Sequence, residues 1–169
     1  MKKSLKMLSK QHHEAMVAKG FWENPNLLEK KMLIISELGE AIEAHRKGRV
    51  CVMSEIDKNA VEWSIDSDEI FSQVFVFFIK DTYEDELADV VLRIWDYMEY
   101  KGYNQIQPQP AKVCENIGEA LYHVTLSIVE ANFNLALDLL YGLSPNMDWH
   151  IKMKMAFNKT RPRRHGKSY

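Results

Sequence analysis

The sequence has few of the residues that interrupt or cross-link a chain. Two cysteines, seven glycines and five prolines occur among 169 residues. Cys51 and Cys114 do not have the spacing of a metal or redox motif, which excludes a disulfide-stabilised scaffold and predicts free thiols in a reducing compartment. The glycines and prolines leave few breaks, and those breaks fall where helices are expected to end.

The chain also lacks a long hydrophobic run and a strong charge of either sign. No stretch approaches 18 uncharged apolar residues, so no membrane association is expected. The first residues are basic, but the polar segment 11–14 interrupts any apolar signal core, and a cytoplasmic protein is predicted. A net charge of −2, from 22 basic and 24 acidic residues, argues against a nucleic-acid partner.

The remaining composition is that of a globular protein. Hydrophobic residues make up 46% of the chain and charged residues 27%. No internal repeat, low-complexity tract or linker divides it, so we expect a single domain over residues 1–169.

Helical periodicity of apolar residues predicts an all-α fold, a bundle of four to five main helices. Gly20, Gly48 and Gly102 fall where three of these helices would end, and a break near Asn132 is expected inside the fourth. The predicted helices cover approximately residues 4–19, 27–47, 82–100, 111–140 and 147–160.

The segment 49–80 is an insert whose structure the pattern leaves open. Phe71, Val74, Phe75 and Phe78 have the i, i+3, i+4, i+7 spacing that favours a helix, but a Val- and Phe-rich stretch is also typical of a strand. Asp81 is predicted to be the N-cap of the helix that follows the insert.

Two helices carry pairs of acids three residues apart, Glu37 with Glu40 and Glu86 with Asp89. Each pair projects from one helix face, so antiparallel packing of the two helices would bring four carboxylates together. Unpaired inward carboxylates repel one another and are costly to desolvate, whereas a hard divalent cation removes both problems. The pattern therefore predicts a magnesium or manganese site.

The alternative for each pair is an ordinary solvated helix face. The apolar neighbours of both pairs favour burial, and the small residues Gly39 and Ala88 within them are expected to let the helices approach closely. A di-iron carboxylate site is set aside because no glutamate is followed three residues later by a histidine.

A basic tail covers about residues 152–169. Lys154, Asn158 and Arg161 lie at i, i+4 and i+7, one helix face that could hold phosphates or a sugar, and His165 and Lys167 follow. A solvated tail is the alternative. Nearer the N-terminus, His12 and Trp22 are candidates for a base pocket, or else core residues.

Several of these segments resemble the MazG-like all-α nucleoside triphosphate pyrophosphohydrolase superfamily. The segments 36–44 and 85–91 are similar to its Glu-x-x-Glu and Glu-x-x-Asp motifs, and 19–22 and 158–167 are similar to flanking segments of small members. The resemblance covers roughly residues 5–48, 81–103 and 150–169.

This resemblance implies a magnesium-dependent enzyme that cleaves a nucleoside triphosphate to the monophosphate and pyrophosphate. Glu37, Glu40, Glu86 and Asp89 would be the metal ligands, and Glu37 or Glu40 would also accept the proton of the attacking water. A site this open also leads us to expect a homodimer or homotetramer.

The chain departs from the family in its long insert and in Ser36, where many members have a second glutamate. Asp85 or Glu43 is the expected replacement for that glutamate. Two other functions stay open: a non-catalytic helical interaction or regulatory module, and an enzyme of the same fold that acts on another diphosphate-containing nucleotide.

Overall fold

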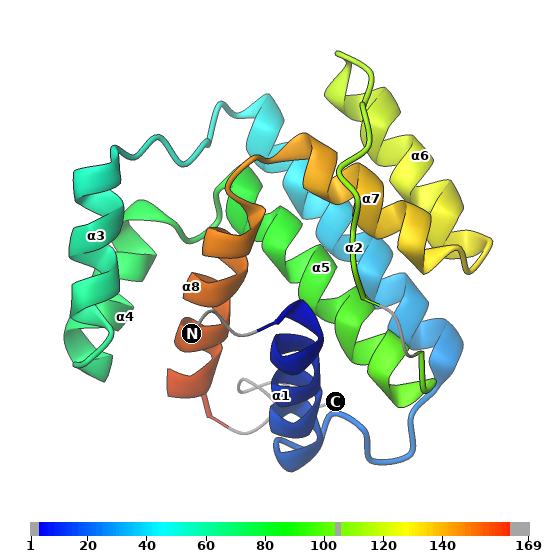
Figure 1. The fold of residues 1–169 in the computed structure, drawn as a ribbon, viewed down its shortest axis with the longest axis horizontal. Helices are drawn as coiled ribbons and strands as arrows, with labels where there is room; N and C mark the ends of the chain where they lie inside the picture. Colours follow the sequence, from blue (N-terminus) through cyan, green and yellow to red (C-terminus); the bar gives the residue numbers. More distant parts are fainter. Residues whose placement is uncertain (1–3, 104–105, 163–169) are drawn as a thin grey trace.

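The computed structural model describes residues 4–103 and 106–162, and these residues contain helices and no strand. The predicted all-α class is thereby confirmed (Figure 1). The described part has eight helices rather than four or five: α1 (Leu5–Ala18), α2 (Leu27–Arg46), α3 (Glu55–Ser64), α4 (Asp68–Phe78), α5 (Tyr83–Tyr100), α6 (Ile117–Val129), α7 (Phe133–Leu143) and α8 (Met147–Thr160).

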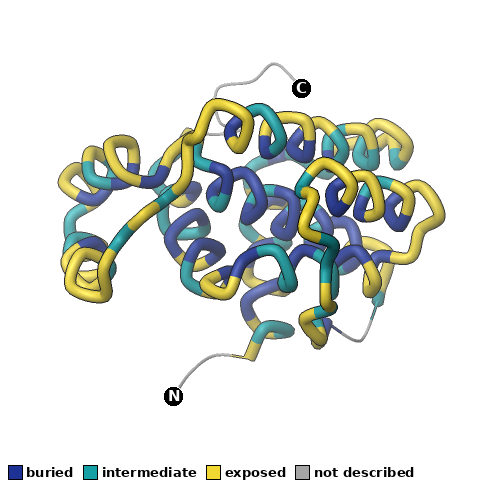
Figure 2. The backbone as a smooth tube through the Cα atoms, turned by 90° about the horizontal axis from the view of Figure 1, so that it is seen from above, coloured by how far each residue is buried: buried dark blue, intermediate teal, exposed yellow. Residues whose placement is uncertain are grey.

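Helix α5 runs through the middle of the molecule and is buried on several sides (Figures 1 and 2). It contacts α1, α2, α7 and α8. Leu87, Val91, Ile94 and Trp95 are fully buried along it and form the centre of the main hydrophobic core. A helix with apolar residues around most of its circumference is stable only when other helices cover it, which explains its central place.

Helices α2 and α5 run antiparallel. The backbone N–H of Tyr83, at the start of α5, donates to the carbonyl of Arg49, just after α2, over 2.8 Å. Further along, Glu37 on α2 bonds Arg93 on α5. The start of α5 therefore lies beside the end of α2. This antiparallel packing is the condition under which the two acidic pairs were expected to meet.

The insert forms an antiparallel hairpin of α3 and α4 that projects to one side of the molecule (Figure 1). The helical interpretation of Phe71 and Phe75 is confirmed, since both are buried on α4. They form a second core cluster with Val61 of α3 and Met153 of α8. Phe75 stacks on Phe157 of α8 with ring centroids 4.3 Å apart, so the hairpin is anchored to α8.

The predicted helix over 111–140 is wrong in its first part. Residues 106–116 are not helical, and α6 and α7 are separate helices with Asn132 as the N-cap of α7, close to the expected break. Pro108 and Pro110 disfavour a helical conformation for the residue before each of them. This segment crosses α7, where the N–H of Ala111 donates to the carbonyl of Asp138 over 2.9 Å.

Two local expectations are also wrong. The N-cap of α5 is Thr82, whose hydroxyl accepts from the N–H of Asp85, while Asp81 has a positive φ of 61°. Gly39 is exposed, and a Cβ there would meet nothing within 4 Å, so it does not provide close helix contact. Ala88, by contrast, is fully buried. Among the described helices, none has the length and apolar character needed to cross a bilayer.

Gly142→Ala is expected to destabilise the protein, whereas Gly39→Ala is expected to stabilise it. A Cβ at Gly142 would lie 2.0 Å from the carbonyl oxygen of Ala111, so backbone must move, at a cost of about 1–3 kcal/mol. At Gly39 alanine only reduces the freedom of the unfolded chain, a gain of about 0.5–1 kcal/mol. Urea unfolding of both variants measures the difference, and a Gly142→Ala protein as stable as wild type would contradict this packing.

Candidate metal centre

Three carboxylates from α2 and α5 meet at one point. One oxygen each of Glu37, Glu40 and Glu86 lies within 4.8 Å of the other two. Opposite ligands of an octahedral magnesium ion are about 4.2 Å apart, given a bond length of about 2.1 Å. Small side-chain movements would therefore suffice for all three to bind one cation.

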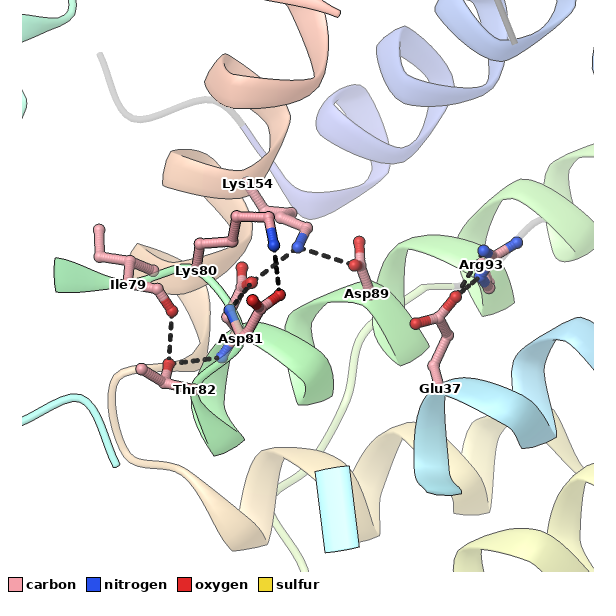
Figure 3. A network of polar contacts seen from close by, with 9 residues as sticks. Glu37, Ile79, Lys80, Asp81, Thr82, Asp89, Arg93 and Lys154 are labelled. Atoms are coloured by element: carbon pink, nitrogen blue, oxygen red, sulfur yellow. Dashed lines mark hydrogen bonds and ion pairs between the residues drawn. The ribbon is translucent and has the colours of Figure 1, made fainter. Parts of the chain in front are cut away.

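Asp89, the fourth predicted ligand, lies outside this three-carboxylate cluster. Its Oδ2 is 2.7 Å from Nζ of Lys154 (Figure 3). The same Nζ lies 2.8 Å from Oδ2 of Asp85. Lys154 is buried and its pKa is raised, with the two aspartates outweighing the effect of burial. The ammonium group thus pairs with the buried Asp85 and the partly buried Asp89, and the role of Asp89 as a metal ligand stays a prediction.

Glu37 is also paired with a cation. Nε of Arg93 donates to Oε1 of Glu37 over 2.7 Å, and Figure 3 shows the two side chains reaching toward each other from α5 and α2. Sequence reasoning missed Arg93. Its position four residues after Asp89 puts it on the ligand face of α5, which is the signal that could have found it.

Because the cluster is largely buried, the ionised form of its carboxyl groups is destabilised unless a positive charge lies nearby. It raises the pKa of Glu86 to about 8; Lys154 opposes this shift and Asp89 adds to it. Burial likewise raises the pKa of Glu37, against the opposing effect of Arg93. These carboxyls therefore bind a proton more readily than an exposed glutamate does, and a divalent cation would satisfy the same need.

The cluster faces a cavity of about 250 Å³, near the lower limit of small-molecule sites. Acidic, basic and aromatic side chains all contribute to its wall. The lining residues are His12, Met16, Phe21, Trp22, Glu29, Lys30, Leu33, Glu37, Glu40, Lys80, Asp81, Glu86, Asp89, Leu92, Arg93, Asp96, Tyr97, Lys154, Phe157, Asn158 and Arg161.

The structure brings the predicted binding residues on α8 to this cavity. Lys154, Asn158 and Arg161 all line it, although Arg161 directly follows the last residue of the helix. Nζ of Lys19 donates to the carbonyls of Asn158 and Arg161, each over 2.6 Å, and so holds the end of α8 against the end of α1. His165 and Lys167 lie outside the described residues.

His12 and Trp22 line the same cavity. His12 is buried, and burial lowers its pKa, so the ring is neutral near pH 7. Trp22 stacks on Tyr100 with centroids 4.2 Å apart, and its Nε1 donates to Asp96 over 2.8 Å. Trp22 is thus held in a fixed orientation by protein groups while part of it borders the cavity.

Neither expected substitute for the family's second glutamate joins the cluster. Asp85 is buried against Lys154 and does not line the cavity. Glu43 is half-exposed and pairs with Lys47, the residue that directly follows α2. Ser36 donates its hydroxyl to the carbonyl of Leu33 on its own helix.

Comparison of the chain with protein families, with curated proteins and with solved structures finds no match.

Magnesium binding is expected to tighten as the pH rises toward 8 and to level off above that value. Below its pKa of about 8, Glu86 carries a proton that the cation must displace, so affinity should change by up to about tenfold per pH unit. Titration calorimetry in two buffers of different ionisation enthalpy would count the released protons. Glu86→Gln should bind more weakly and release fewer protons; the same affinity at pH 6.5 and 8.5 would refute this interpretation.

Proposed function

We propose that this chain is a magnesium-dependent nucleotide pyrophosphohydrolase, which cleaves a nucleoside triphosphate to the monophosphate and pyrophosphate. The observation that carries the proposal is the meeting of Glu37, Glu40 and Glu86 in a cavity that Lys154 and Arg161 also line. Carboxylates for a cation and basic groups for phosphates are the two parts that hydrolysis of a phosphoanhydride requires. The MazG-like motifs in the sequence support the same assignment.

The residues fit magnesium or manganese. The cluster offers oxygen donors only, which is the preference of hard divalent cations, and Asp89 borders the same cavity. Glu37, Glu40 and Glu86 would hold the ion, with Asp89 as a fourth ligand. When bound, the ion would supply a water of lowered pKa and neutralise phosphate charge.

Glu40 is the better candidate for the general base. An oxygen of the Glu37 carboxylate is occupied by the ion pair with Arg93, and Glu86 is buried. Glu40 is the exposed member of the cluster and borders the cavity. It could accept the proton of an attacking water without giving up an ion pair.

Lys154 and Arg93 have a second role in this proposal. A carboxylate that ligates a cation keeps less of its attraction for an ammonium or guanidinium group, so these two side chains would turn to the phosphate oxygens of the substrate. Asn158 and Arg161 would extend the contact along α8. The nucleoside would occupy the part of the cavity near Trp22.

Pyrophosphate release from a panel of canonical and modified nucleoside triphosphates should require magnesium and should vanish in Glu86→Gln, Asp89→Asn. The double change replaces two anionic carboxylates with neutral amides, which bind a divalent cation much more weakly, while keeping the shape of both side chains. We expect a loss of at least about a thousandfold in kcat/KM. A colorimetric pyrophosphate assay, with the monophosphate identified by chromatography, measures both products.

Glu43→Gln is the matched control, because Glu43 lies on α2 with Glu37 and Glu40 but pairs with Lys47 outside the cavity. It should keep full activity. If no triphosphate is cleaved, and wild type and double variant show the same thermal stability with or without magnesium, the chain is instead an interaction module. If only another diphosphate-containing nucleotide is cleaved, the chain is still a magnesium-dependent hydrolase, but its substrate is not a nucleoside triphosphate.

Lys154→Met should bind magnesium more tightly and nucleotide less tightly than wild type. Without its ammonium group, Asp89 loses the cation that competes for it, and the phosphates lose a contact. We expect several-fold tighter magnesium binding in calorimetry and about a tenfold rise in KM. Lys152→Met, an exposed change on the same helix, should alter neither value. Equal magnesium affinity in Lys154→Met and wild type would show that Lys154 does not compete for Asp89.

A further inference from the structure

Helix α5 presents four charged side chains to the cavity: Glu86, Asp89, Arg93 and Asp96. They follow one another at intervals of three, four and three residues, so they lie along a single stripe of the helix. Glu86, at one end of the stripe, belongs to the three-carboxylate cluster. Asp96, at the other end, lies about 15 Å further along the helix axis and belongs neither to that cluster nor to its ion pairs.

Two donors from outside α5 hold Asp96 by the same oxygen. Nδ1 of His13, on α1, lies 2.6 Å from Oδ1 of Asp96. Nε1 of Trp22, in the turn after α1, donates to the same Oδ1 over 2.8 Å. Both hydrogen bonds that the described residues make to Asp96 thus end on Oδ1. The second oxygen, Oδ2, is therefore the atom of Asp96 that is available to a ligand in the cavity.

The indole ring of Trp22 is itself in contact with protein groups. Tyr100 stacks on it with ring centroids 4.2 Å apart, and Nζ of Lys30 lies over the ring, 5.1 Å from its centroid. Trp22 therefore serves Asp96 as a hydrogen-bond donor more than it serves a ligand as a stacking surface. At this end of the cavity, the means of telling one ligand from another is the hydrogen bond that Asp96 can accept.

An ionised carboxylate accepts hydrogen bonds and donates none, so Oδ2 attracts a donor and repels a carbonyl oxygen. In any nucleotide the sugar stands between the phosphates and the base. With the phosphates at the three-carboxylate cluster, the part of the ligand that reaches Asp96 is therefore the base. Cytosine and adenine carry an exocyclic amino group at the position where uracil and hypoxanthine carry a carbonyl oxygen.

We propose that Oδ2 of Asp96 accepts a hydrogen bond from the exocyclic amino group of the base. The substrates would then be triphosphates of amino-bearing bases, such as cytosine or adenine, and not those of uracil, thymine or hypoxanthine. This role of Asp96 rests on the proposed function, which places the phosphates at the opposite end of the cavity.

Asp96→Asn tests the direction of this hydrogen bond with almost no change of shape. The indole N–H of Trp22 can only donate, so the amide of the variant must turn its oxygen toward Trp22. Its NH₂ group then stands where Oδ2 stands in wild type. A donor would face the base in place of an acceptor, and the variant should favour the carbonyl oxygen of uracil or hypoxanthine.

Calorimetry with the α,β-methylene analogues of CTP, UTP, ATP and ITP, in the presence of magnesium, measures recognition without hydrolysis. In each pair that binds, CTP with UTP and ATP with ITP, wild type should bind the amino-bearing member at least about tenfold more tightly. Asp96→Asn should lower that ratio at least about tenfold. Circular dichroism and the melting temperature of the variant check its fold.

Glu99→Gln is the matched control. Glu99 also lies on α5 and accepts hydrogen bonds from α1, from Lys6 and Ser9, but it does not line the cavity. The change removes the same charge and weakens the same helix contact. It should leave the ratio of affinities in both pairs as in wild type.

Pyrophosphate release from CTP, UTP, ATP and ITP separates this role of Asp96 from the proposed function. If the analogues bind with the expected ratios and no triphosphate is cleaved, Asp96 recognises the base but the chain is not the proposed enzyme. If triphosphates are cleaved and the wild-type ratios are near one, the enzyme stands and the role of Asp96 is refuted, whether or not Asp96→Asn folds. Binding of none of the four analogues would also refute it. So would an Asp96→Asn protein that weakens both members of a pair equally, because Asp96 would then contact the sugar.

Discussion

The structure depends most on how it holds buried negative charge at the contact between α2 and α5. Asp85, Glu86 and Glu37 are 1%, 5% and 6% exposed, and an unpaired carboxylate at such depth costs several kcal/mol. Lys154 neutralises Asp85, and Arg93 neutralises Glu37. Glu86 has no such ion pair among the described residues, and its pKa is raised. The residual preference for a positive partner at Glu86 is the physical reason to expect a cation.

The same ion pairs connect the three-carboxylate cluster to the rest of the fold. Lys154 comes from α8, so its ion pairs with Asp85 and Asp89 help to orient α8 toward the cavity that Asn158 and Arg161 also line. Lys19 holds the end of that helix from α1. A substrate that contacts Lys154 would therefore meet a group whose position the core already specifies, and little conformational entropy would be lost in ordering it.

Much of this arrangement could be predicted from the sequence, because regular periodicity and paired acids are local signals. The helices near 27–46 and 147–160 follow from apolar spacing. The spacing of the acids, with antiparallel packing, predicted that Glu37, Glu40 and Glu86 would meet, but it also placed Asp89 with them. The start of α6 at residue 117 rather than 111 was not predicted, because Pro108 and Pro110 mark only the beginning of the non-helical segment, which runs on to residue 116 across α7. The pairing of Asp89 with Lys154 joins residues 65 positions apart in the chain and has no local signal.

The insert, α3 and α4, adds surface to the molecule without displacing the carboxylate cluster of α2 and α5. Glu40 and Glu86 flank the hairpin in sequence, yet the bond from Tyr83 to Arg49 closes the base of the insert over 2.8 Å and keeps α2 and α5 in register. The relative position of the acidic pairs is therefore set outside α3 and α4. Because the hairpin packs on α8 through Phe71 and Phe75, its outer face can change composition at little cost to the core.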